Sequence, residues 1–191
     1  MKLLEDAIIN QGEVLSGEVL KVGSFLNQQL DVKLLRAISK EIYEHFKDKQ
    51  VNKVLTIEAS GIALAVLVAE EFGAKAVFAK KSKTANVSGE VYKADCFSYT
   101  HKNLNTLVVP KEYLVKQDCV LILDDFLAHG EAVNACINIV KESGATLAGI
   151  AIAIEKGFQG AGDELRKKGL DLFSLVIVDE MEKGKIVFRN R

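Results

Sequence analysis

Two adjacent carboxylates, Asp124 and Asp125, follow the apolar run VLIL and precede the stretch FLAHGEA. A pair of ionised carboxylates accepts several hydrogen bonds side by side, which suits neighbouring hydroxyl groups of a sugar. An apolar strand that delivers two negative charges to its end indicates a ligand rich in hydroxyl groups or in positive charge. The pair is therefore the first candidate for binding chemistry.

The turn after the acid pair is suited to a phosphate group. Its small residues let the backbone approach a ligand closely. The first N–H groups of the helix expected after it have no partner within that helix, and the helix dipole favours an anion there. A ligand with a phosphate in this turn and two neighbouring hydroxyl groups on the acid pair would be a phosphorylated ribose. The positions of this expected phosphate turn are Ala128, His129, Gly130, Glu131 and Ala132.

Other sites that place acids after a strand need motifs that this sequence lacks. A P-loop ATPase requires G-x-x-x-x-G-K-[ST], and a dinucleotide-binding domain requires G-x-G-x-x-G; neither occurs here. A phosphoacceptor site of the response-regulator kind stays open on the acids alone. However, its acids come from different strands, and it leaves the glycine turn unexplained.

The elements that must position these groups alternate between apolar strands and helical patterns. Strands that alternate with helices of about three turns indicate βαβ units. We therefore predict an α/β fold, a parallel twisted sheet flanked by helices. The expected strands cover 51–61 with its turn, 75–80, 119–125, 146–156 and 172–179, and the expected helices cover 3–10, 31–47, 62–73, 131–144 and 162–169.

In parallel sheets, ligands bind at the carboxyl ends of the strands, so residues at those ends are further site candidates. The first expected strand ends in the turn EASG at 58–61, and the strand at 146–156 ends at Lys156, shortly before Phe158. Residues 80–100 carry lysines and tyrosines without a sustained period. We expect them to form a mobile flap or β-arm.

Length, composition and charge bound the class of protein. With 191 residues, 49% of them hydrophobic, the chain is expected to form one domain, 1–191. A formal net charge of -1 gives no basic footprint for nucleic acid. The apolar runs are far shorter than the ~20 residues that span a bilayer, and no export signal is visible. Three cysteines without metal-type spacing fit a soluble protein of the reducing cytoplasm.

Four segments together resemble the bacterial xanthine phosphoribosyltransferases of the type I phosphoribosyltransferase family. In chain order they are SFLNQQLD, TIEASGIALAV, ILDDFLAHGEA and IAIEKGFQGAGDEL, and the resemblance runs over nearly the whole chain. There is one departure. Many family members carry Thr or Ser hydroxyls in the phosphate turn and AHGEA has none, so phosphate binding would depend on backbone N–H groups.

The resemblance implies transfer of a phosphoribosyl group from 5-phosphoribosyl pyrophosphate (PRPP) to xanthine, giving xanthosine monophosphate and pyrophosphate, with Mg²⁺ bound on the pyrophosphate. Asp124 and Asp125 would hold the ribose hydroxyls and stabilise positive charge that develops on the sugar. Ala59, Ser60 and Gly61 would lie beside the pyrophosphate, with backbone N–H groups facing its oxygens.

The resemblance also implies how the single domain is arranged. Residues 1–50 would form an N-terminal lid and helix, and 51–191 a PRPP-binding core with a flap at about 80–100. A homodimer is expected, with two alternatives left open: the flap serves its own subunit's site or that of the partner subunit. The lysines expected to meet the pyrophosphate at the base of the flap are Lys80, Lys81 and Lys83.

Base recognition draws on residues from both ends of the chain. Lys156 is a donor suited to a 6-oxo group or the neighbouring ring nitrogen, and not to the exocyclic amine of adenine. A leucine and an asparagine in the lid of the resembled enzymes contact the base, and the matching positions are Leu20 and Asn27. The Asn27 amide would donate to the 2-oxo group of xanthine. Phe158 is a candidate for stacking on the base.

Two alternative functions stay open at this point. A purine-responsive regulator can keep the PRPP motif as a sensor, but this sequence has no basic stripe and no spare segment for a DNA-reading module. An enzyme for hypoxanthine and guanine is the other alternative. His129 in an exposed turn is expected to be solvated and not a general base. The expected partners are PRPP, xanthine and a second copy of the chain, with no nucleic acid and no membrane.

Overall fold

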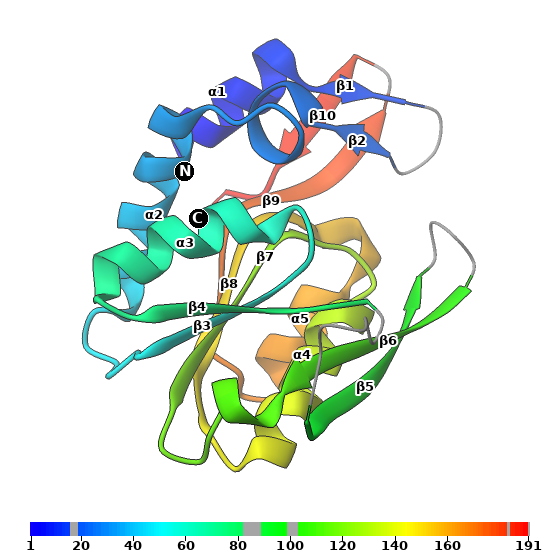
Figure 1. Cartoon of the computed structure of the whole chain (residues 1–191). Helices are drawn as coiled ribbons and strands as arrows, with labels where there is room; N and C mark the ends of the chain where they lie inside the picture. The colour runs from blue at the N-terminus through cyan, green and yellow to red at the C-terminus, as the bar shows by residue number, and fades with distance from the viewer. Residues whose placement is uncertain (16–18, 82–88, 99–102, 183, 191) are drawn as a thin grey trace.

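The structure, a computed structural model, is built on one central sheet with helices on both faces (Figure 1). It describes residues 1–191 except 16–18, 82–88, 99–102, 183 and 191. The six strands of the sheet lie in the order β10, β9, β8, β7, β3, β4. In chain order these are β3 (Lys53–Ile57), β4 (Lys75–Ala79), β7 (Cys119–Leu127), β8 (Thr146–Lys156), β9 (Leu172–Glu182) and β10 (Lys185–Phe188).

The predicted parallel α/β sheet is confirmed for five neighbouring strands, β9, β8, β7, β3 and β4. The edge strand β10 is antiparallel to β9 and was not expected. With only four residues, it carries too little periodicity to be recognised from the sequence. The sheet therefore has one short antiparallel edge beside the chain's C-terminal residues.

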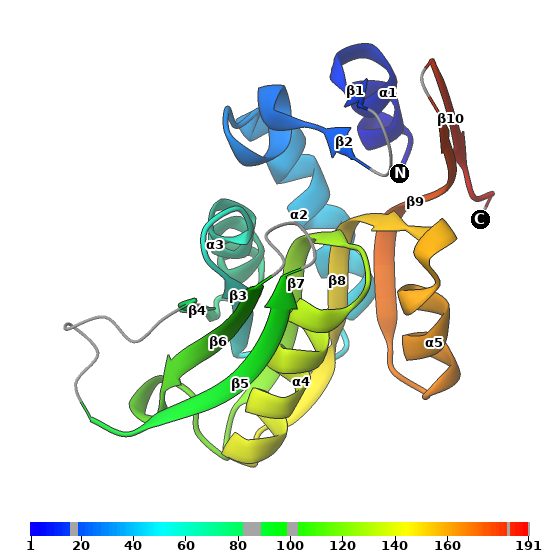
Figure 2. The same cartoon turned by 90° about the vertical axis from the view of Figure 1, so that its right-hand side faces the viewer.

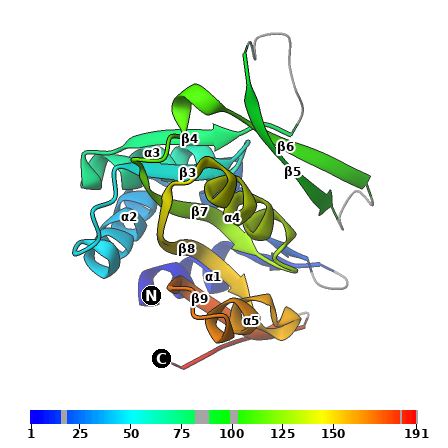
Figure 3. The ribbon, with the colours of Figure 1, turned by 90° about the horizontal axis from the view of Figure 1, so that it is seen from below.

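Successive residues of each central strand point to opposite faces and build two separate cores. Leu121 belongs to the core under α2 and α3, and its neighbour Ile122 belongs to the core under α4 and α5. Figure 3 shows the two pairs of helices on opposite sides of the sheet. Their bounds are α2 (Val32–Phe46), α3 (Gly61–Phe72), α4 (Glu131–Ser143) and α5 (Ala161–Lys167).

The N-terminal segment before α2 covers one end of the sheet, beside β9 and β10 (Figures 1 and 2). It is fixed there by apolar side chains, because Leu4, Ile8 and Phe25 are fully buried. Asp31 ends this segment by capping α2, and its carboxylate accepts hydrogen bonds from the first turn of that helix. The elements of the segment are α1 (Lys2–Gln11), β1 (Glu13–Val14), β2 (Leu20–Lys21) and η1 (Gly23–Asn27).

Part of the expected flap forms a β-arm. Strands β5 (Val91–Ser98) and β6 (Asn103–Pro110) pair antiparallel, and β5 packs against α4. An antiparallel bridge between Lys80 and Val108 ties the arm to the end of β4. Other parts of the flap, including Lys83, lie outside the described residues. Among the residues that are described, no helix is long and apolar enough to cross a membrane.

Candidate active site

A cleft of about 780 Å³ lies where the parallel strands end. Its walls come from the β3–α3 loop, the β5–β6 arm, the segment from β7 into α4, and the end of β8. This is the edge at which sheets of this kind bind ligands. The predicted site residues that line it are Ser60, Lys81, Asp124, Asp125, Ala128, His129, Gly130, Glu131, Ala132 and Lys156.

The acid pair lies within β7 and not at its end. β7 continues to Leu127, which pairs with Glu155 of β8, so the sequence placed the end of this strand too early. On the other side, pairing with β3 stops at Ile122. The strand is therefore paired on one side only where it carries Asp124 and Asp125, and this opens the pair to the cleft.

The two acids differ in environment. Asp125 is 6% exposed, and Asp124 is half-buried. Burial raises the pKa of Asp124 well above its usual range, and the adjacent charge of Asp125 raises it further. The positive charge of Lys81 acts in the opposite direction. A ligand that brings hydroxyl donors or positive charge to this pair would favour the ionised form of Asp124.

Asp125 connects three parts of the cleft. Its Oδ1 accepts a hydrogen bond from Ser60 Oγ at 2.9 Å, and its Oδ2 accepts one from Asn27 Nδ2 at 3.1 Å. Its backbone N–H donates to Asp124 Oδ1 at 2.9 Å. The contact with Asn27 joins residues 98 positions apart in the chain. The N-terminal segment thereby reaches the same carboxylate as the β3–α3 loop.

The phosphate turn has the backbone geometry that its sequence predicted. Gly130 has φ of 86°, a left-handed conformation that favours glycine, and it directly precedes the first residue of α4. A Cβ atom at Gly130 would lie 3.1 Å from the side chain of Ala161, so space around the turn is tight. The helix that begins at Glu131 directs its unpaired N–H groups toward this turn. His129 is exposed on its rim.

The loop after β3 forms a second tight turn beside the acids. The Glu58–Ala59 peptide bond is cis, and Ser60 reaches Asp125 as described above. Glu58 accepts a hydrogen bond from the backbone N–H of Lys81 at 2.8 Å, which holds the start of the flap against this loop. Ala59 and Gly61 lie on either side of Ser60 and do not line the cleft. A Cβ atom at Gly61 would collide with Thr56 Oγ1.

The predicted base-binding residues do not all meet in the cleft. Lys156 lines it, with Nζ 5.8 Å from the ring centroid of Phe126. Asn27 reaches it through the hydrogen bond to Asp125. Leu20 is 7% exposed and belongs to the core under α2 and α3, and its neighbour Val19 lines the cleft instead.

Among the aromatic residues, the structure brings Phe126 to the cleft and not Phe158. Phe158 lies in the short helical turn after β8, is 37% exposed, and does not line the cleft. Phe126 lies on β7 directly after Asp125 and packs against the core under α2 and α3, which also contains Leu121 and Leu123. The expected end of the strand at Asp125 left Phe126 outside the predicted strand.

The β-arm contributes cleft residues that no sequence pattern predicted. Cys96 and Phe97 of β5 and Asn105 and Leu107 of β6 line the cleft opposite the acid pair. Burial raises the pKa of the Cys96 thiol, so the arm presents a neutral group here. Nothing in the local sequence of an arm strand predicts which distant elements it will face.

The acidic groups of the cleft suit a magnesium ion that arrives on a phosphorylated ligand. Within the described ranges, no cluster of three or more His, Cys, Asp or Glu side chains is arranged to hold a metal ion. Mg²⁺ commonly keeps several waters and binds through one or two carboxylates together with substrate phosphates. Asp124, Asp125 and Glu58 all line the cleft and supply such carboxylates.

Comparisons with known proteins agree with this geometry. Residues 21–186 match the family model described as phosphoribosyl transferase domain. A xanthine phosphoribosyltransferase of Bifidobacterium adolescentis is 49% identical over 193 residues, covering 100% of both chains. Another, of Ruminiclostridium cellulolyticum, is 45% identical over 188 residues, covering 98% of this chain and 99% of the relative.

Solved structures show the same fold. The adenine phosphoribosyltransferase of Giardia lamblia, solved with 9-deazaadenine, superposes with a TM-score of 0.77 at 25% identity, covering 94% of this chain and 98% of the other. The adenine phosphoribosyltransferase of Rhodothermus marinus gives a TM-score of 0.74 at 18% identity, covering 93% and 100%. The sheet and its flanking helices are therefore shared with these structures.

Proposed function

The chain belongs to the phosphoribosyl transferase domain family, and on this basis we propose that it transfers the 5-phosphoribosyl group of PRPP to xanthine, releasing pyrophosphate. The relatives named xanthine phosphoribosyltransferase, 45 and 49% identical over nearly their full lengths, support the choice of base. The observation that carries the proposal is structural. An acid pair, a small-residue turn before a helix, and Lys156 all meet in one cleft, which Asn27 reaches through Asp125.

The ribose of PRPP binds to the acid pair in this proposal. In the ligand-free chain, both oxygens of the Asp125 carboxylate already accept hydrogen bonds from neutral donors, Asn27 and Ser60. A ribose diol offers the same kind of donor and can replace one of them without leaving the buried carboxylate unpaired. As the bond to pyrophosphate lengthens, positive charge develops on the sugar, and the two carboxylates stabilise it.

The 5′-phosphate binds in the phosphate turn, Ala128 to Ala132. Because no side-chain hydroxyl is available there, the donors are backbone N–H groups at the start of α4. Glu131 puts a carboxylate in the first helical turn, so the phosphate must bind against the backbone and away from that side chain. Gly130 makes the close approach possible.

The pyrophosphate lies between the β3–α3 loop and the base of the flap. Ser60 and Lys81 line this side of the cleft, and Lys81 brings positive charge to it. Ala59 and Gly61, on either side of Ser60, are proposed to add backbone N–H groups of the same tight turn. The carboxylates of Glu58, Asp124 and Asp125 would help to hold the Mg²⁺ that is bound with PRPP. When bound, this ion would neutralise charge on the leaving pyrophosphate.

The base lies between Lys156 and the N-terminal segment. Lys156 donates to the 6-oxo side of the purine, which favours 6-oxopurines over adenine. Asn27 donates to the 2-oxo group that distinguishes xanthine from hypoxanthine. Phe126 offers an aromatic face beside Lys156 and is better placed to contact the base than Phe158. Leu20 supports the N-terminal segment from its core.

Two further features are part of the proposal and rest on the family resemblance. We propose that the enzyme acts as a homodimer and works in the cytoplasm. All three cysteines are free thiols in the structure, which suits a reducing compartment.

The proposal is tested by incubating the purified protein with PRPP, xanthine and Mg²⁺ and measuring both products. We expect xanthosine monophosphate and pyrophosphate in equal amounts, and loss of both when a chelator removes the metal. Binding of PRPP without product from any purine would contradict the proposal and place the chain with the PRPP sensors.

A further inference from the structure

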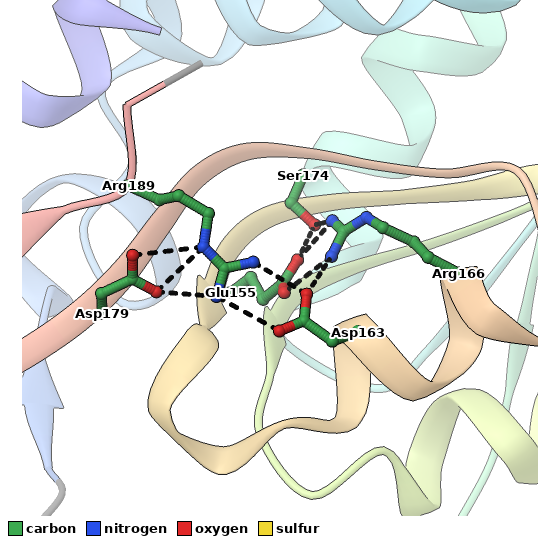
Figure 4. Close-up of polar contacts among 6 residues, drawn as sticks. All are labelled: Glu155, Asp163, Arg166, Ser174, Asp179 and Arg189. Carbon is green, nitrogen blue, oxygen red and sulfur yellow. Dashed lines mark hydrogen bonds and ion pairs between the residues drawn. The ribbon is translucent and has the colours of Figure 1, made fainter.

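A group of charged and polar side chains surrounds the end of β8, directly beside Lys156, and is shown in Figure 4. We call this group the β8 clamp. It joins the end of β8 to η3 (Gly157–Gln159), α5, β9 and the residues after β10. None of its members lines the cleft. The clamp consists of Glu155, Asp163, Arg166, Ser174, Asp179 and Arg189.

Glu155 is the buried centre of the clamp. It is 1% exposed, and Arg166 binds both of its oxygens, with Nη1 3.0 Å from Oε1 and Nη2 2.7 Å from Oε2. Ser174 of β9 also donates to Oε2, and Arg166 Nη2 donates to Ser174 Oγ at 3.2 Å. A buried carboxylate with a bidentate guanidinium and a hydroxyl is fixed in one orientation. The end of β8 is thereby fixed to β9 and α5.

A second part of the clamp holds the residues that follow Lys156. Arg189 donates from Nε and Nη2 to Asp179 Oδ1 at 3.0 and 2.8 Å, and from Nη1 to Asp163 Oδ1 at 2.8 Å. The backbone of Gly157 passes directly against this pair. A Cβ atom there would lie 2.5 Å from Asp179 Oδ1 and 3.0 Å from Arg189 Nη2. Asp163 also contacts Arg166 at 3.5 Å, which joins the two parts.

Lys156 lies between the two fixed residues. Side chains alternate along a strand, so Glu155 and Lys156 point to opposite faces of β8. Arg166 and Ser174 fix the Glu155 side chain. The backbone of Gly157 lies close against the Asp179–Arg189 pair. The peptide that carries Lys156 is therefore confined on both sides. The Lys156 side chain is long and flexible, so its ammonium group can be positioned against a purine only if the backbone that carries it is fixed.

We propose that the β8 clamp positions Lys156 for base recognition, so that Arg189 and Asp163 help to determine the affinity for xanthine without touching it. This inference rests on the proposed function, because it takes Lys156 as the residue that meets the purine. The part of the clamp around Arg189 lies on the base side, whereas Glu155 also pairs with Leu127, directly before the phosphate turn. Asp125 of the acid pair is held by contacts outside the clamp, its hydrogen bonds with Asn27 and Ser60.

Arg189→Ala is the most informative variant, because Arg189 is a third exposed and leaves the buried Glu155–Arg166 pair intact. We expect the KM for xanthine to rise ~10-fold, while the KM for PRPP stays unchanged. Amide hydrogen exchange should increase at residues 156–159 and not in the phosphate turn. Asp163→Asn, which keeps the shape of the side chain, should shift both measurements in the same direction by less.

Two comparisons separate positioning from general stability. Arg36→Ala removes another Arg–carboxylate pair between two elements, that of α2 with Glu70 of α3 at 3.4 Å, which includes no clamp residue, and should leave both KM values unchanged. In a double-mutant cycle, Arg189→Ala should add nothing to the xanthine KM of Lys156→Ala, because the side chain to be positioned is gone.

The outcomes distinguish this inference from the proposed function. If the unmodified chain turns over no purine, both are overturned. Suppose instead that the unmodified chain turns over xanthine, but Arg189→Ala leaves the KM for xanthine unchanged or raises the KM for PRPP equally. The positioning role of the clamp is then overturned, and the proposed function stands. Full additivity of Arg189→Ala and Lys156→Ala would also overturn the clamp.

Discussion

The proposed phosphoribosyl half and the proposed base half of the cleft are assembled in different ways. The acid pair and the phosphate turn come from one continuous stretch, Asp124 to Ala132, in which a strand passes through a glycine turn into a helix. The base half combines Asn27 of the N-terminal segment, Phe126 of β7 and Lys156 of β8. One half is defined locally, and the other exists only after the whole domain has folded.

This difference suggests that the two halves can change independently. The backbone N–H groups of a tight turn bind a phosphate in much the same way whichever side chains are nearby. The base half depends on side chains that are held from separate elements, through the Asn27–Asp125 contact and the β8 clamp. Base preference can therefore be altered at those supports while PRPP binding is retained. Asp125 connects the two proposed halves, because it belongs to the acid pair and contacts Asn27.

The largest effect is expected at that shared residue. Asp125→Asn keeps the shape of the side chain but removes a charge that stabilises the developing positive charge on ribose. We expect kcat to fall ~100-fold or more, measured at saturating PRPP and xanthine.

Asp118→Asn is the matched control, because it changes a buried acid just before the other end of β7. It should leave kcat near that of the unmodified chain among molecules that remain folded. Equal losses of kcat in the two variants would remove Asp125 from the mechanism.

The next effect should be confined to the phosphoribosyl half. Gly130→Val places a branched side chain on a residue with φ of 86° and 3.1 Å from Ala161, which blocks close backbone approach. We expect the KM for PRPP to rise ~10-fold or more, with little change in the ranking of bases.

Gly144→Val controls for backbone strain, since Gly144 has φ of 75° at the other end of α4. It should lower thermal stability without changing the KM for PRPP. A PRPP affinity unaltered by Gly130→Val would contradict the assignment of the phosphate turn.

The sequence predicts the local half of the site better than the dispersed half. The strand–acid–turn–helix pattern is contained in one segment, so its geometry follows from local rules. Where β7 ends was misjudged, because pairing with β8 carries the strand past Asp125 to Leu127. That error left Phe126 outside the predicted strand. The contact between Asn27 and Asp125 spans 98 positions and depends on packing that no local pattern records.

A smaller effect should appear in the base half alone. Asn27→Ala removes the donor assigned to the 2-oxo group, and should reduce the preference for xanthine over hypoxanthine about tenfold in kcat/KM. The KM for PRPP should change little, because a ribose hydroxyl can satisfy the freed Asp125 oxygen.

Asn10→Ala, at an exposed position of α1, serves as the control for the loss of an amide. A xanthine preference that survives Asn27→Ala unaltered would mean that another group reads the 2-oxo position.

The smallest effect is on stability and concerns the acid pair without its ligand. Burial and Asp125 raise the pKa of Asp124, so its stabilising contribution is present at low pH and is lost as pH rises through the raised pKa. Asp124→Asn, which stays neutral, should therefore exceed the unmodified chain in unfolding free energy by about 1 kcal/mol at pH 8 and by less at pH 4. Urea denaturation at both pH values measures this difference. A difference that does not grow with pH would contradict the raised pKa of Asp124.

The central claim is that a PRPP site built from one continuous segment adjoins a base site that prefers xanthine. Its most direct test is kcat/KM for xanthine, guanine, hypoxanthine and adenine, measured on the unmodified chain at saturating PRPP and Mg²⁺. The account predicts that xanthine gives the highest value and adenine the lowest. A higher value for hypoxanthine, guanine or adenine would contradict the roles of Lys156 and Asn27 while keeping the PRPP site, and no turnover with any base would contradict the transfer itself.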